Sequence, residues 1–229
     1  MKAESEIIED FYKQFFKQEL IVVFTEKTPK EMMASSVDEG GWFEWKPIDG
    51  TLTVEQYRVI EQKFNVKFPD TFIAWHKKYY FLDADFSVVR LPYSSPNEPL
   101  QRIIENLDND TARGLVKMKI YPFGSEGNDA GPLVFDGRFE VEDNNYPVRF
   151  YDYNYCGDIE GLSEIIFSSF TKLLECITHL NKELETRKCY EIYPDFISID
   201  PEGAGKEGID YWLGWAAMEK ANDEYFGDL

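Results

Sequence analysis

The chain is poor in basic residues, histidine and cysteine. Its 229 residues include 24 Lys and Arg against 43 Asp and Glu, which gives a formal charge of −19, with only 2 His and 3 Cys. A surface that binds nucleic-acid phosphates needs clustered lysine and arginine, and an anionic membrane repels a chain of this charge. We therefore expect neither nucleic acid nor membrane as a partner. The charge favours a basic protein partner, with solubility alone as the alternative.

Long apolar stretches are also missing. The longest stretch without Asp, Glu, Lys or Arg is Tyr211–Met218, eight residues, whereas a membrane helix needs about 20 apolar residues. Residues 1–6 offer neither the positive nor the apolar region of a secretion signal. Cys156, Cys176 and Cys189 are odd in number and widely spaced, which suits free thiols in a reducing compartment. We expect a cytoplasmic protein.

Motifs for cofactor and metal chemistry are incomplete. Gly203–Lys206 resembles the end of a phosphate loop, but Glu207 stands where Ser or Thr would hold magnesium. His76 and His179 have no partners at metal-ligand spacing, and no GxSxG or CxxC motif occurs. We therefore expect no catalytic residue, no cofactor and no metal. His76, beside Trp75, is expected in the interior.

The chain is nevertheless rich in core-forming residues. Hydrophobic residues make up 43% and aromatic residues 16%, which is typical of a folded protein and not of an acidic disordered chain. The length suits one large domain, or one domain with extensions. Residues 51–100 carry six basic and six acidic side chains, whereas residues 151–229 carry six and seventeen. The acidic excess therefore lies mainly toward the two ends.

Hydrophobic periodicity predicts helices, then strands, then helices, which favours an α+β fold. Thr53 and Gln56 have the spacing of a capping box, and Asn65 is expected to end that helix. Helices are expected at about 4–19, 53–64, 69–80, 103–107, 160–187 and 209–226. Strands are expected at 20–24, as a buried strand, and at 86–91, 115–123, 132–135, 146–155 and 190–199.

Three carboxylates near a glycine-rich turn are one candidate site. Glu126 and Asp129 flank the turn, and Asp136 follows the next strand. Two such groups could share a proton or a metal ion if the fold brought them close. The alternative is a solvated turn in which Asp129 caps its own loop.

A tyrosine-rich segment is a second candidate. In a strand, Tyr151, Tyr153 and Tyr155 would share one face. Tyrosine combines an apolar ring with a hydroxyl and is a typical interface anchor. The alternative is that these rings cover the core beneath a helix.

Several short motifs follow one another between about residues 42 and 182. They are Trp45-x-Pro47, the helix Thr53–Phe64, Phe68-Pro69-x-x-Phe72, Tyr121-Pro122-Phe123-Gly124, Gly127-Asn128, Gly131-Pro132-Leu133, Tyr146-Pro147-Val148 and Ser169-Phe170-x-x-Leu173-Leu174. Their order resembles the SUKH superfamily, the Smi/Knr-type glucan-synthesis regulators and bacterial toxin-immunity proteins. One departure is Tyr79-Tyr80-Phe81, where the family commonly has an Asn-Gly turn.

The resemblance implies a mostly antiparallel central sheet with helices packed against it, in a SUKH-like domain at 42–187. Residues 1–41 would form a helix/strand extension packed on the core, and residues 188–229 an acidic strand-helix extension. The implied function is non-enzymatic protein binding, as an immunity protein that neutralises a cognate basic toxin such as a nuclease. The alternatives are a regulatory scaffold of cell-wall synthesis or signalling, and a metal-assisted hydrolase using the three carboxylates.

For a partner surface, the sequence offers the three tyrosines and the acidic tail with its two tryptophans. The candidate partner-binding residues are Tyr151, Tyr153, Tyr155, Trp212, Trp215, Glu202, Glu207, Asp210, Asp223 and Glu224. The sequence leaves the oligomeric state open.

Overall fold

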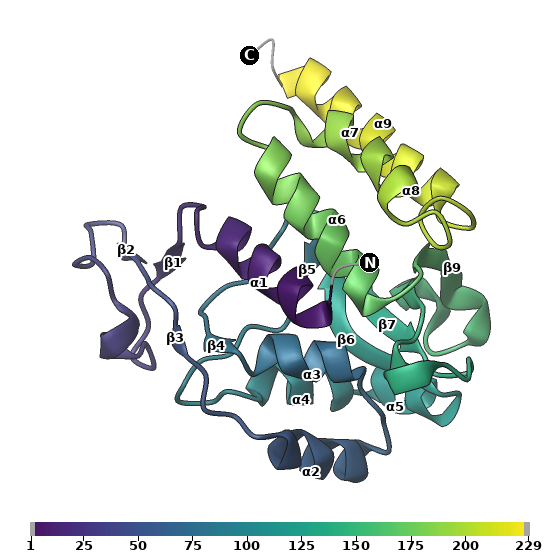
Figure 1. Ribbon diagram of the computed structural model, residues 1–229, viewed down its shortest axis with the longest axis horizontal. Helices are drawn as coiled ribbons and strands as arrows, with labels where there is room; N and C mark the ends of the chain where they lie inside the picture. Colours follow the sequence, from purple (N-terminus) through teal and green to yellow (C-terminus); the bar gives the residue numbers. More distant parts are fainter. Residues whose placement is uncertain (1–2, 227–229) are drawn as a thin grey trace.

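The computed structural model describes residues 3–226 (Figure 1). Within this range the chain forms nine α-helices and nine strands. The helices are α1 (Glu4–Phe15), α2 (Val54–Phe64), α3 (Asp70–His76), α4 (Gln101–Leu107), α5 (Asp110–Lys117), α6 (Phe170–Glu183), α7 (Cys189–Ile192), α8 (Phe196–Ile199) and α9 (Ile209–Phe226). The strands are β1 (Ile21–Val23), β2 (Trp42–Glu44), β3 (Ile48–Asp49), β4 (Tyr79–Tyr80), β5 (Val89–Arg90), β6 (Ile120–Glu126), β7 (Pro132–Asp136), β8 (Val148–Tyr151) and β9 (Leu162–Phe167).

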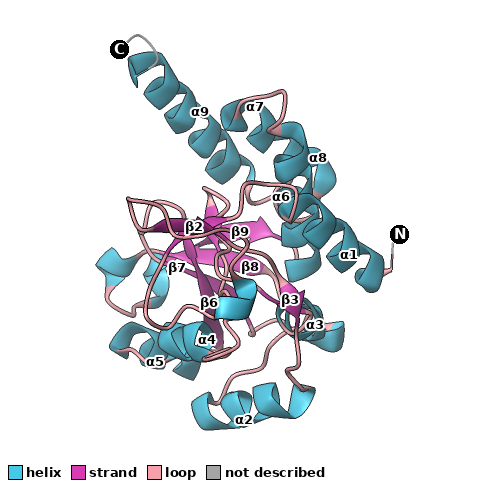
Figure 2. Cartoon of the chain, turned by 90° about the vertical axis from the view of Figure 1, so that its left-hand side faces the viewer, coloured by secondary structure: helices cyan, strands magenta, loops and turns pink. Residues whose placement is uncertain are grey.

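The central sheet has five antiparallel strands in the order β5-β6-β7-β8-β9, so each strand pairs with its neighbour in the sequence. Two further sheets are two-stranded, β1 with β2 and β3 with β4. Helices α1, α3 and α6 gather on one side of the central sheet, whereas α4 and α5 lie on another (Figure 2). The architecture is α+β, as the sequence predicted.

A stacked pair of rings forms the centre of the main core. Phe123 of β6 and Phe135 of β7 have their ring centroids 3.9 Å apart and their planes 10° apart. Phe72 of α3 and Phe170 of α6 pack edge-on against this pair and against each other. All four side chains have no exposed surface. The cluster thereby joins α3 and α6 to the sheet.

The opposite face of the sheet carries a smaller apolar cluster beneath α5. It consists of Leu115, Ile120, Val134 and Tyr151. Neighbouring residues of one strand point to opposite faces, so Val134 lies in this cluster while Phe135 lies in the main core. Both faces of the central sheet are therefore covered, which explains why all five residues of β7 are buried.

Two local signals in the sequence are confirmed at α2. The backbone N–H of Thr53 donates to Oε1 of Gln56 at 2.9 Å, as expected of a capping box. Asn65 ends the helix in the left-handed conformation, with φ 55°, which asparagine tolerates better than most residues.

The glycine-rich turn between β6 and β7 is set by close backbone contacts. A Cβ at Gly127 would lie 1.7 Å from the carbonyl oxygen of Ser87, and one at Gly131 would lie 1.8 Å from that of Tyr151. No side chain fits at either position. These two glycines let the hairpin contact its neighbours on both sides.

The helix expected at 160–187 begins later than predicted. Leu162–Phe167 forms the edge strand β9, and α6 begins where the Oγ of Ser169 accepts a hydrogen bond from the backbone N–H of Lys172 at 3.2 Å. The apolar residues Leu162 and Ile165 fit a helical spacing as well as a strand. Periodicity alone therefore placed the boundary wrongly.

Other predicted boundaries are also wrong. Tyr79 and Tyr80 do not continue α3 but form β4, which pairs with Ile48 and Asp49. The strand predicted at 190–199 is instead the short helices α7 and α8. Packing of this segment on α9 and α6 overrides the strand propensity of its aromatic and β-branched residues.

The strand expected at 132–135 is confirmed as β7 (Pro132–Asp136), but other strand predictions have wrong boundaries. The strand expected at 115–123 begins at Ile120, because residues 115–117 end α5, and the strand expected at 86–91 is reduced to Val89–Arg90. The strand at 20–24 forms, but it is not buried, since Val23 is 49% exposed.

One hydrophobic core draws on all parts of the chain. Its members include Phe11 from the N-terminal segment, Phe72 from the middle and Trp212 from the tail. Between residues 3 and 226, no helix combines the length and apolar character needed to cross a bilayer. All three cysteines are unpaired.

His76 lies in this core, as expected, but it is only partly satisfied. Its Nδ1 is 2.7 Å from the hydroxyl of Tyr57, whereas among residues 3–226 its Nε2 has only a poorly aligned interaction, with the backbone of Tyr93. Burial lowers the pKa of His76 to about 3. The side chain is therefore neutral in the folded protein at any pH near neutrality.

This pKa predicts a loss of stability in mild acid. Between pH 6.5 and 3 the unfolded chain binds a proton on His76 that the folded protein excludes, so stability falls as the pH falls. From pH 6.5 to 5, the free energy of unfolding should drop by about 1.5 kcal/mol more in the wild type than in His76→Gln. Urea denaturation at each pH measures this difference. An equal decline in the two proteins would contradict the prediction.

Candidate partner-binding surfaces

The three tyrosines of the predicted strand do not share one face. The strand β8 ends at Tyr151, and Tyr153–Tyr155 form a single turn of 3₁₀ helix. Tyr151 is fully buried beneath α5, whereas Tyr153 and Tyr155 are 48% and 46% exposed. The prediction of a common face is wrong because the period-2 alternation stops where the strand ends.

Tyr151 instead holds the following loop in place. Its hydroxyl accepts a hydrogen bond from the backbone N–H of Gly157 at 2.6 Å. Gly161 lies against the same ring, since a Cβ there would be 2.8 Å from it. The Asp152 side chain accepts from the N–H of Asn154 at 2.8 Å, and the Asp152 N–H donates to the carbonyl of Gly161 at 2.9 Å. The loop is therefore fixed at both ends and in the middle.

This loop presents an exposed mixture of apolar and acidic side chains. Residues 152–164 contain four acidic residues and no basic residue. We define the acidic loop surface by its exposed side chains Tyr153, Tyr155, Asp158, Ile159 and Glu160. Among residues 3–226, no Lys, Arg or His forms an ion pair with Asp158 or Glu160. These two carboxylates are therefore available to form ion pairs with a partner protein.

The neighbouring turn adds to the negative field. Tyr153 donates its N–H to the carbonyl of Ala130 at 3.1 Å, which places it beside the turn that carries Asp129. Burial, and then the Asp129 carboxylate, raise the pKa of Tyr153. The ring thus remains a neutral phenol at physiological pH.

The three carboxylates proposed as a catalytic or metal site do not come together. Asp136 of β7 pairs with Ile120, the first residue of β6, at one end of the hairpin. Glu126 is the last residue of β6, at the other end. Six residues of strand separate the two ends by about 20 Å. In the described part of the chain, no group of three His, Cys, Asp or Glu side chains is arranged to hold a metal ion.

Each of these carboxylates has a local structural partner. Asp136 is fully buried and accepts bonds from Arg138 at 2.7 Å and Arg149 at 2.9 Å. Burial acts to raise the pKa of Asp136, but the two guanidinium groups outweigh it and hold this pKa below its ordinary value. Glu126 accepts from the N–H of Asn128 at 2.7 Å, and Asp129 pairs with an arginine of β5.

The two tryptophans of the tail belong to the core and not to a surface. Trp212 is fully buried and Trp215 is 6% exposed. The indole N–H of Trp212 donates to the carbonyl of Ile166 at 2.9 Å, and its ring contacts Phe167 and Phe196 at 4.9 and 4.8 Å. They attach α9 to the edge strand β9, so the prediction that they contact a partner is wrong.

Four of the five acidic tail residues predicted to contact a partner form ion pairs within the chain. Asp223 pairs with Lys188 at 2.6 Å, and three longer contacts of 3.8–3.9 Å join Glu202 to Lys206, Glu207 to Arg149 and Glu224 to Lys220. Asp210 is exposed on α9 without an ion pair among residues 3–226. The tail therefore offers less free negative charge than its composition indicates.

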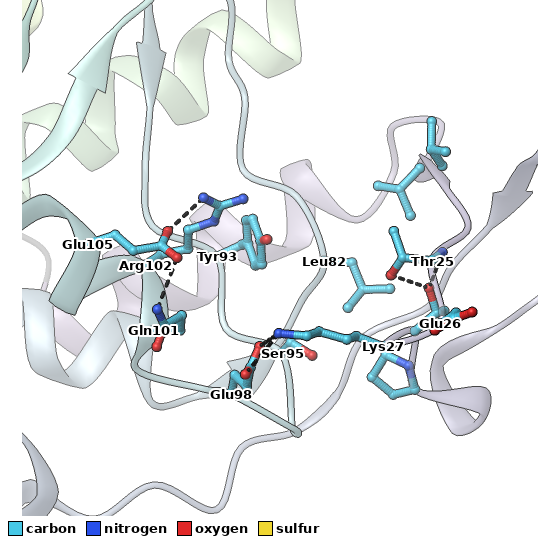
Figure 3. A pocket seen from close by; sticks show the side chains of 14 residues that line it. Thr25, Glu26, Lys27, Leu82, Tyr93, Ser95, Glu98, Gln101, Arg102 and Glu105 are labelled. Atoms are coloured by element: carbon cyan, nitrogen blue, oxygen red, sulfur yellow. Dashed lines mark hydrogen bonds and ion pairs between the residues drawn. The ribbon is translucent and has the colours of Figure 1, made fainter.

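A groove of about 600 Å³ lies at the opposite end of the molecule, between β1 with the loop that follows it and α4 (Figure 3). Its apolar lining includes Val22, Val23, Leu82 and Tyr93. Lys27 crosses one end of the groove and contacts Glu98 through both carboxylate oxygens, at 2.9 and 3.1 Å.

The polar groups of the groove mostly satisfy one another. Arg102 pairs with Glu105 at 2.7 Å, and its guanidinium lies 4.6 Å from the centre of the Tyr93 ring. The lining residues include neither histidine nor cysteine. The sequence did not predict this groove, because the run of apolar residues at 20–24 is typical of a buried strand and gives no sign of an open edge.

Comparisons with known proteins identify no relative. No family model matches the chain, no curated protein matches it, and no solved structure matches it.

The placement of the tyrosines predicts unequal effects on stability. Tyr151→Ala should lower the free energy of unfolding by about 3 kcal/mol or more, because it leaves a cavity and frees the loop. Tyr151→Phe should lose about 1 kcal/mol, the net contribution of one hydrogen bond. Tyr155→Ala should change stability by less than about 0.5 kcal/mol. Urea denaturation measures all three, and similar losses for Tyr151→Ala and Tyr155→Ala would contradict this placement.

Proposed function

We propose that this chain is a non-enzymatic protein-binding domain of the SUKH type that neutralises a cognate basic toxin by stoichiometric binding. The acidic loop surface is the contact region. The observation that carries the proposal is the pairing of exposed Tyr153, Tyr155 and Ile159 with unpaired Asp158 and Glu160 in one fixed loop. Tyrosine anchors and complementary charge are what a specific interface needs.

The rigidity of the loop supports this role. A loop already held in one conformation loses little conformational entropy on binding. Here the hydrogen bonds that Tyr151 and Asp152 accept hold the loop in one conformation. The partner is therefore expected to bind a preformed surface.

The net negative charge of the chain favours a partner with positive charge. A formal charge of −19 attracts a basic protein and accelerates its association. Toxic nucleases must themselves bind anionic phosphates, so their binding surfaces are basic. An acidic protein that covers such a surface would block access to the nucleic acid.

A regulatory scaffold is the second candidate function. The observation that favours it is a second exposed apolar region, on the β1–β2 ribbon, where Val23 and Trp42 are 49% and 48% exposed. A scaffold uses separate surfaces for separate partners. The ribbon and the acidic loop surface lie at opposite ends of the molecule (Figure 1).

A binding experiment with the basic protein encoded beside this gene tests the proposal. The full chain should bind it in a 1:1 complex, and the association rate should fall at least about tenfold between 50 and 300 mM salt. The double variant Tyr155→Ser/Glu160→Gln should weaken binding by about 30-fold or more. Calorimetry gives the stoichiometry and affinity, and surface plasmon resonance gives the rates.

The matched control carries the same kinds of change on α2, at exposed Glu55 and Val59. Glu55→Gln/Val59→Ser should bind as the wild type does. Absence of a complex, salt-independent association, or equal weakening by both double variants would overturn the proposed role of the loop. Capture of several unrelated partners and no toxin would favour the scaffold.

A further inference from the structure

The β1–β2 ribbon leaves one backbone edge open. The carbonyl of Leu20 accepts from the N–H of Trp45 at 2.8 Å, and the N–H of Phe24 donates to the carbonyl of Gly41 at 2.8 Å. In an antiparallel pair, residues that bond to the partner strand alternate with residues that face away. The backbone groups of Ile21 and Val23 therefore point away from β2.

Nothing else in the described chain bonds to this edge. No backbone or side-chain hydrogen bond from another part of residues 3–226 reaches the N–H or C=O groups of Ile21 and Val23. The outer edge of β2, in contrast, is covered, because the N–H groups of Ala34 and Ser35 donate to the carbonyl of Glu44. Protein edge strands are commonly blocked by a charge, a proline or a bulge. β1 has none of these, and only its short length limits pairing.

The groove of Figure 3 runs along the same edge. Val22 and Val23 are consecutive, so their side chains point to opposite faces of the ribbon. Both nevertheless line the groove, which therefore meets the ribbon at the open edge of β1. The far wall is formed by Leu82, Tyr93 and α4. An extended segment placed there would bond to β1 and bury its side chains in the groove.

The surrounding charge selects the chemistry of that segment. Lys27 and Arg102 are already paired with Glu98 and Glu105. Exposed Glu26, on the groove wall, and Glu44, beside Ile21 in the register, form no ion pair among residues 3–226. A second copy of the chain would bring its own negative charge of −19 to this place. A segment with alternating apolar and basic residues fits better than a second copy.

We propose that β1 binds an extended basic segment of a partner protein as an added strand. The segment forms up to four backbone hydrogen bonds with Ile21 and Val23, packs its apolar side chains on the face that carries Val22, and places Lys or Arg on the opposite face, beside Glu44. Main-chain pairing supplies affinity and the flanking side chains supply specificity. This inference does not depend on the acidic loop surface.

The test uses an eight-residue peptide of alternating lysine and valine, with blocked termini, against the full ¹⁵N-labelled chain. At 50 mM salt it should shift the amide signals of Ile21 and Val23 most strongly. Methylation of all its backbone nitrogens should weaken binding at least tenfold, because the peptide backbone then donates no hydrogen bond. Val23→Lys should also weaken binding at least tenfold, with an unchanged melting temperature.

Val59→Lys is the matched control, since it makes the same change at an exposed valine of α2. It should bind the peptide as the wild type does. Equal binding of the methylated peptide, or equal weakening by Val23→Lys and Val59→Lys, would show attraction to the net charge alone and overturn the proposal. So would the absence of binding at millimolar peptide, or a dimer of the free chain that Val23→Lys dissociates. Tyr155→Ser should leave peptide binding intact, which separates this site from the acidic loop surface.

Discussion

The packing of four phenylalanine rings is the constraint on which the rest of the structure depends. Phe123 and Phe135 stack across neighbouring strands, and Phe72 and Phe170 pack on them from two helices. Rings in such edge-on and stacked contacts fix the orientation of the elements that carry them. Because α3 and α6 keep this contact, they cover that face of the sheet. Helix α1 then packs on α6, and α9 packs against β9.

The motifs that resemble the SUKH superfamily mostly supply this core. Phe68-Pro69-x-x-Phe72 places Phe72 at its centre, and Ser169-Phe170 begins α6 with a capping serine and a buried ring. Gly127 and Gly131 serve the same end, since they allow the hairpin to approach its neighbours. Such motifs specify a fold, whereas partner choice depends on side chains outside the core. The resemblance therefore bears on architecture more directly than on the identity of a partner.

Tyr151 connects the core to the acidic loop surface. Its ring fills the apolar cluster beneath α5, while its hydroxyl holds the N–H of Gly157. The exposed tyrosines that follow are thereby presented from a fixed base. At the other end of the molecule, the ribbon β1–β2 has no such cover, and its edge and groove remain accessible. The two regions differ in kind, since one offers side chains and the other offers backbone groups.

The sequence by itself determined the fold class, the capped helix α2, the last helix α9 and the sign of the surface charge. These features are local or compositional, and neighbouring residues carry enough information to specify them. Tertiary structure decided that Tyr151, Trp212 and Trp215 are buried, that residues 162–167 form a strand, and that Glu126 and Asp136 stand at opposite ends of a hairpin. It also decided that β1 has an open edge. Burial and strand pairing depend on which distant segments meet, and an aromatic or apolar run looks the same in sequence whether a partner element covers it or not.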